Sequence, residues 1–151
     1  LHEVGGLRRF LFGNDGRPEA PPMAILTLSE AIARHPNSGL LRYLLGRQIV
    51  QHGDPARALG YLEEARRLGL PGAAFDAENT RLMAVALFRT GAFDRARSEF
   101  ERIAADPARP ESARRDAADW RQRCEWAARR RARGIDPSGS NARIPPPGAD
   151  E

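Results

Sequence analysis

Residues 39–71, GLLRYLLGRQIVQHGDPARALGYLEEARRLGLP, carry the pattern of a helical hairpin. Apolar residues recur at three- and four-residue spacing in both halves, which places them on one face of each helix. They are Leu41, Leu44, Leu45 and Ile49 in the first half, and Ala58, Leu62 and Ala65 in the second. Gly53 separates the halves, because glycine readily takes the left-handed conformation that ends a helix. Asp54 and Pro55 follow as the N-cap and first residue of the next helix.

Gly46 lies in the middle of the first predicted helix. Glycine at such a position costs about 1 kcal/mol relative to alanine. A contact between helices that leaves no room for a β-carbon would justify this cost, so we expect Gly46 to lie where two helices touch.

The order of these residue types resembles the tetratricopeptide repeat family. The residues that carry the resemblance are Leu45, Gly46, Gly53, Ala58, Leu62, Ala65 and Pro71. One departure is Arg42, which stands where the family has an aromatic residue, with Tyr43 after it. The pattern also recurs, as a repeat family requires. Its copies are Ala24, Leu28 and Ala31 at an offset of 34 residues backward, and Met83, Ala84, Leu87, Gly91, Ala96 and Phe100 at an offset of 38 forward.

The resemblance implies an all-α fold, in which antiparallel helix hairpins form a right-handed superhelical stack over residues 20–109. We expect a helix from Pro21 to near Pro36, and further helices at about 39–52, 55–69, 77–90 and 92–105. Ser38 and Asp76 are the predicted N-caps of two of them. The four extra residues of the longer offset are predicted to form a loop at 71–74.

Three segments lie outside the predicted repeats. Residues 110–134 are predicted to form a long capping helix that packs on the helix 92–105 through Ala113, Ala117, Trp120, Cys124 and Ala127. Residues 1–19 are predicted to be a mostly irregular arm that either caps the stack or docks on a partner or an anionic membrane surface. Residues 135–151 are rich in proline and glycine, which predicts a disordered or extended tail.

Composition bounds the class of protein. The formal net charge is +4, and all 24 basic residues are arginine. Two explanations for the absence of lysine are codon usage and selection for the binding of phosphate or carboxylate groups. No apolar run approaches the ~20 residues that span a bilayer. The single cysteine, Cys124, is expected to be a buried small hydrophobe. Leu1 in place of methionine indicates a processed product or a piece of a longer protein, so the sequence leaves cytoplasm, periplasm and membrane periphery open.

Catalytic patterns are missing from the sequence. None of His2, His35 and His52 pairs with a nearby serine or cysteine in a nucleophile motif, and there is no phosphate-binding glycine loop. Glu63 and Glu64 precede Arg66 and Arg67 at helical pairing distance, so ion pairs explain them. We therefore expect no enzymatic activity, no cofactor and no bound metal.

Two candidate partner-binding surfaces remain. The resemblance implies that the first helix of each hairpin lines a concave groove, and the residues there are Tyr43, Arg47, Val50, Arg81, Val85 and Phe88. Aromatic residues and arginine are typical of binding hot spots. The alternative is that Val50, Val85 and Phe88 pack between helices. The expected ligand is an extended or helical segment with acidic and apolar residues.

The second surface is the outer face of the long helix, where Arg123 and Arg130 are close enough to stack on Trp126. It is either a solvated face or a docking surface for an acidic protein or anionic lipid head groups, with nucleic acid the weaker choice. The sequence thus predicts a non-catalytic protein–protein interaction module or accessory scaffold subunit of a larger, membrane-associated or soluble complex, and a second copy could cover its open end. The alternatives are a nucleic-acid-binding protein and a regulatory domain of a longer enzyme or membrane protein.

Overall fold

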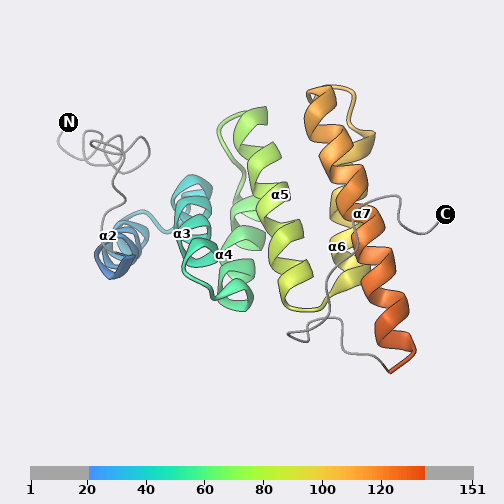
Figure 1. The fold of residues 1–151 in the computed structure, drawn as a ribbon. Helices are drawn as coiled ribbons and strands as arrows, with labels where there is room; N and C mark the ends of the chain where they lie inside the picture. The colour runs from blue at the N-terminus through green and yellow to red at the C-terminus, as the bar shows by residue number, and fades with distance from the viewer. Residues whose placement is uncertain (1–20, 135–151) are drawn as a thin grey trace. The chain divides into compact units, whose positions relative to one another are not determined.

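The computed structural model describes residues 21–134, and the described residues form six α-helices and no strand (Figure 1). The helices are α2 (Pro21–Arg34), α3 (Gly39–Gln51), α4 (Pro55–Leu68), α5 (Ala73–Arg89), α6 (Phe93–Ala105) and α7 (Glu111–Ala132). Within this range no helix is long and apolar enough to cross a membrane. The predicted arm at 1–19 and tail at 135–151 lie outside the described residues.

The chain divides between Gly69 and Leu70 into two compact units. Unit 1 contains α2, α3 and α4, and unit 2 contains α5, α6 and α7. Within each unit, helices that follow one another in the sequence pack together. The all-α prediction is confirmed, whereas the superhelical stack over residues 20–109 stays a prediction.

The α3–α4 hairpin of unit 1 has the predicted local features. The Ser38 hydroxyl accepts a hydrogen bond from the Leu41 N–H, and the Asp54 carboxylate accepts one from the Arg57 N–H, both at 3.2 Å. Each cap satisfies a backbone donor that the first helical turn leaves unpaired. Glu64 and Arg67 form the expected ion pair along α4.

The turns of the α3–α4 and α5–α6 hairpins share one hydrogen-bond pattern at an offset of 38 residues. In the first turn, the N–H groups of His52, Gly53 and Asp54 donate to the carbonyls of Gln48, Val50 and Ile49 at 3.1–3.2 Å. In the second, the N–H groups of Thr90, Gly91 and Ala92 donate to Ala86, Phe88 and Leu87 at 2.9–3.0 Å. The central glycines have φ values of 88° and 83°, a region that glycine enters without strain. The two hairpin turns therefore share one backbone geometry.

Unit 2 departs from the prediction at its first helix. Helix α5 begins at Ala73, four residues before the expected start at residue 77, so Ala73 and Ala74 are helical rather than part of a loop. Asp76 lies in the first turn and is not the N-cap, which is Gly72. Alanine is the strongest helix former, and an acid in the first turn stabilises the positive end of the helix dipole, so the helix begins at Ala73, directly after Gly72.

Helix α7 packs on α6 through the predicted stripe, in which Ala117, Cys124 and Ala127 are buried. The Trp120 ring stacks on Phe100 with centroids 5.6 Å apart and meets Phe88 edge-on at 5.2 Å. An aromatic cluster therefore joins all three helices of unit 2.

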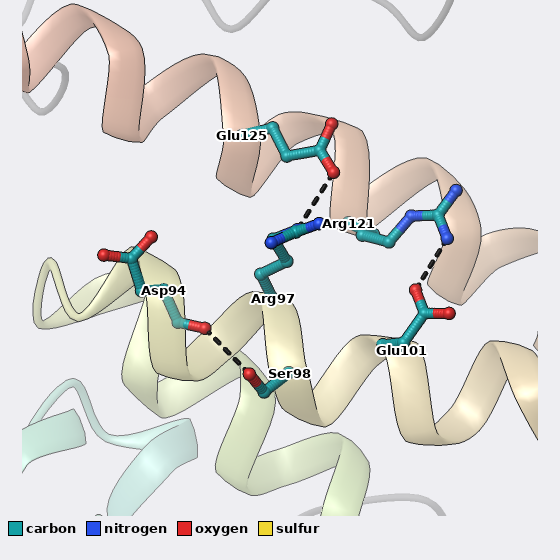
Figure 2. Close-up of polar contacts among 6 residues, drawn as sticks. All are labelled: Asp94, Arg97, Ser98, Glu101, Arg121 and Glu125. Carbon is teal, nitrogen blue, oxygen red and sulfur yellow. Dashed lines mark hydrogen bonds and ion pairs between the residues drawn. The ribbon is translucent and has the colours of Figure 1, made fainter.

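Two ion pairs lie along the α6–α7 contact (Figure 2). Arg97 pairs with Glu125 at 2.9 Å, and Arg121 pairs with Glu101 at 2.6 Å. The hydrogen bond from Arg121 to Glu101 raises the pKa of the Arg121 guanidinium. The four side chains are 34–55% exposed, so neither ion pair contributes much to stability.

Candidate binding site

Unit 2 contains a groove of about 680 Å³ between the start of α5, the end of α6 and the start of α7. Small side chains leave this space open: Ala73, Ala74, Ala77, Ala108, Ala113 and Ala117. Phe100 and Ile103, which are buried core residues, also line it. We call this site the unit 2 groove.

Charged side chains accompany the apolar lining of the unit 2 groove. Arg81 forms an ion pair with Glu78 at 2.6 Å. Arg109 donates a hydrogen bond from Nη1 to the Ala77 carbonyl at 3.1 Å and lies 3.5 Å from the Asp106 carboxylate. The Arg109 side chain is only 15% exposed, so it ties the α6–α7 loop to α5 and fixes one wall of the groove.

The three groove residues predicted in unit 2 lie in three different environments in the structure. Arg81 lines the unit 2 groove and is exposed. Val85 is half-buried and is not part of the lining. Phe88 is half-buried in the aromatic cluster, where its ring lies 5.3 Å from that of Phe93. For Phe88 the alternative of packing between helices is therefore correct.

The predicted groove residues of unit 1 require a correction. Tyr43 is 2% exposed and Val50 is 5% exposed, so neither forms the exposed surface that we expected, while Arg47 is half-buried. The reason is that eight of the thirteen residues of α3 are buried. A helix that is buried around most of its circumference has no separate apolar face to offer a ligand.

The predicted surface around Trp126 is present in part. The Arg130 guanidinium lies over the Trp126 ring, 4.7 Å from its centroid, as expected. Arg123 instead lies over Trp120, at 4.6 Å. Trp126 and Arg130 are both half-buried. Arg130 covers part of the Trp126 side chain, and part of that side chain is accessible to solvent. We call this pair the Trp126 surface.

Cys124 is a structural residue, as predicted. It is fully buried, and burial raises the pKa of its thiol to about 12. A thiol with such a pKa is protonated at neutral pH and is a poor nucleophile. Within the described residues no group of three or more His, Cys, Asp or Glu side chains could hold a metal ion.

Sequence reasoning did not find the loop side of the unit 2 groove. From the sequence, Asp106 and Pro107 were predicted only to end a helix. In the structure, the Asp106 carboxylate also accepts a hydrogen bond from the Ala108 N–H at 3.0 Å. An aspartate that bonds the backbone two residues on is a known turn signal. That signal could have located the turn, but not the contact of Arg109 with α5, which lies 32 residues away in the sequence.

The chain matches no protein-family model, and comparisons with curated protein sequences and with solved structures give no match. The resemblance to tetratricopeptide repeats therefore stays a prediction from the sequence.

Proposed function

We propose that this chain is a non-catalytic protein–protein interaction module, an accessory or scaffold subunit that holds a segment of a partner protein. The observation that carries the proposal is the unit 2 groove. Its volume of about 680 Å³ falls in the range of roughly 300–1,000 Å³ that is usual for ligand sites. An apolar centre with charged side chains around it is also the usual composition of a protein interface.

The side chains of the unit 2 groove favour binding over chemistry. Its titratable groups are carboxylates and arginines, and Arg81 and Arg109 are engaged with Glu78 and Asp106. Such pairs fix the position of charge around a ligand, which suits the recognition of a partner segment. No histidine or cysteine lines the groove.

We further propose that both units are tetratricopeptide-like. The support is the turn hydrogen-bond pattern, which recurs at the offset of 38 residues that the sequence predicts. A second support is Gly46, where an added β-carbon would meet the Leu62 side chain at 2.6 Å. This is the close helix contact that the family's leucine–glycine pair implies.

The Trp126 surface is the proposed second contact, for an acidic segment of the same or another partner. The end of α7 carries Arg129, Arg130 and Arg131 in its last turn, where cations also stabilise the helix dipole. An acidic segment would meet Arg130 and the half-buried indole, a combination typical of binding hot spots, whereas Arg131 is bonded to the Gly91 carbonyl and lies over the Phe93 ring.

The experiment blocks the unit 2 groove without disturbing the core. Ala74 is the exposed second residue of α5 and lines the groove, and Ala56 is the exposed second residue of α4 and does not. The full chain and the variants Ala74→Trp and Ala56→Trp are immobilised and used to capture crosslinked proteins from native lysate. We expect the captured set to be kept by Ala56→Trp and lost by Ala74→Trp. Equal capture by both variants would exclude the groove as the binding site.

A further inference from the structure

We infer that the unit 2 groove selects a partner segment that carries arginine or lysine side chains together with apolar residues. This selectivity rests on the proposed function, and it specifies the chemical class of the partner segment. It reverses the sign of charge that the sequence led us to expect, which was an acidic segment.

The charges around the groove are predominantly negative. Four carboxylates line it, those of Asp76, Glu78, Asp106 and Asp116, against two guanidinium groups, a formal balance of −2. Both guanidinium groups are engaged, Arg81 with Glu78 at 2.6 Å and Arg109 with Asp106 at 3.5 Å. An incoming acidic segment would therefore meet arginines that are already neutralised.

The two remaining carboxylates are available to a ligand. Asp76 and Asp116 are exposed, and neither side chain forms an ion pair with any residue between 21 and 134. Asp76 extends from α5 and Asp116 from α7, so the two lie on different helices that border the same apolar space. They are placed to pair with cations of a ligand.

Helix dipoles weaken this negative field but do not reverse it. The N-termini of α5 and α7 both border the groove, and each adds about half a positive charge. Against a formal balance of −2 the groove stays negative.

The spacing of the carboxylates distinguishes a peptide from a metal ion. In the described part of the chain, no three of them converge closely enough to hold a metal ion. Dispersed carboxylates suit cations that are separated along a flexible chain. The alanines, with Phe100 and Ile103, give the groove an apolar lining that can contact apolar side chains of the ligand.

The experiment selects ligands from a random peptide library displayed on phage, with the immobilised full chain as bait and Ala74→Trp as the counter-selection. We expect enriched peptides with a net positive charge and apolar residues. Their affinity, measured by fluorescence anisotropy, should fall about fivefold or more in the variant Asp76→Asn with Asp116→Asn. It should also fall when NaCl is raised from about 50 to about 500 mM.

The matched control is Asp94→Asn with Asp119→Asn, which leaves the groove unchanged. Asp94, like Asp76, lies in the first turn of a helix without a side-chain cap, and Asp119, like Asp116, belongs to α7. We expect the selected peptides to bind this control as they bind the unchanged chain. Acidic or neutral peptides that Ala74→Trp rejects would overturn the inference and leave the proposed function standing. If no peptide discriminates against Ala74→Trp, the groove is not a binding site and both proposals fail.

Discussion

Gly46 of α3 lies directly against the side chain of Leu62 of α4. A β-carbon at Gly46 would stand 2.6 Å from Leu62 Cδ2 and 2.8 Å from Leu62 Cγ, which is closer than side chains approach one another. Leu62 is fully buried, so its side chain can withdraw only by repacking against its core neighbours. The contact explains why a glycine occupies the middle of a helix.

Gly46→Ala should therefore destabilise the protein, although alanine is the better helix former. Gly60 provides the matched control, because it lies within α4 and a β-carbon added there would have no other atom within 4 Å. Gly60→Ala should gain about 0.5–1 kcal/mol from helix propensity. Gly46→Ala has the same gain but also overpacks the helix contact, at a cost of about 1–3 kcal/mol. Urea unfolding followed by circular dichroism measures the difference, and equal stabilisation of both variants would contradict the close contact.

The two tryptophans should differ in their contribution to stability. Trp120 stacks on Phe100 and meets Phe88 edge-on, whereas the ring contact of Trp126 is with the Arg130 guanidinium. Trp120→Ala should lower the free energy of unfolding by about 2–4 kcal/mol, and Trp126→Ala by about 1 kcal/mol or less. Thermal unfolding of both variants checks the order. A larger loss for Trp126→Ala would be inconsistent with the aromatic cluster.

Cys124 should resist thiol reagents in the folded protein. Burial raises the pKa of its thiol from 9.0 to about 12, so the thiolate fraction at pH 8 falls about a thousandfold relative to an unperturbed thiol. A disulfide reagent such as dithionitrobenzoate should label the chain rapidly in guanidinium chloride and barely at all in buffer. Rapid labelling of the native chain would show that the thiol is accessible.

The same pKa predicts how Cys124 couples stability to pH. The folded protein keeps the thiol proton between about pH 9 and 12, where the unfolded chain loses it. The free energy of unfolding therefore falls with rising pH in this window, by about 1.4 kcal/mol per pH unit for this group. The stability difference between the unchanged chain and Cys124→Ala should shrink as pH rises from about 8 to about 10.5. A difference that does not change with pH would contradict the raised pKa.

The pair of Arg121 and Glu101 should contribute little to stability. Their side chains are 34% and 51% exposed, so solvent screens the attraction. A double-mutant cycle with Arg121→Ala and Glu101→Ala should give a coupling energy of about 0.2–1 kcal/mol. The coupling should decrease further in about 1 M NaCl. A coupling above about 2 kcal/mol, or one that salt leaves unchanged, would mean that the pair is effectively buried.

Local pattern was sufficient to predict the helices and most of the core. Ser38, Gly53 and Asp54 act through their own backbone neighbours, so their roles can be derived from sequence alone. The start of α5 was missed because the repeat offset located the extra residues but not their conformation. Propensity favours helix for Ala73 and Ala74, and it decided the outcome.

The candidate site was less predictable, because it depends on which helices meet. Helical periodicity assigns Tyr43 to a separate face of α3, but tertiary packing buries that face as well. Of the six predicted groove residues, Arg81 lines the unit 2 groove. The partners of Arg109 and Arg123 were not predictable for the same reason, since a long side chain has several acceptors or rings within reach.

The recurrence of one turn geometry in two hairpins has a practical consequence for mutagenesis. Gly53 and Gly91 hold the same backbone conformation, yet His52 and Asp54 flank the first while Thr90 and Ala92 flank the second. The two turns differ in their surroundings, because a β-carbon added at Gly91 would meet the Arg131 guanidinium, whereas one added at Gly53 would have no other atom within 4 Å. A substitution at Gly53 therefore tests the backbone conformation alone, and the same substitution at Gly91 adds the contact with α7.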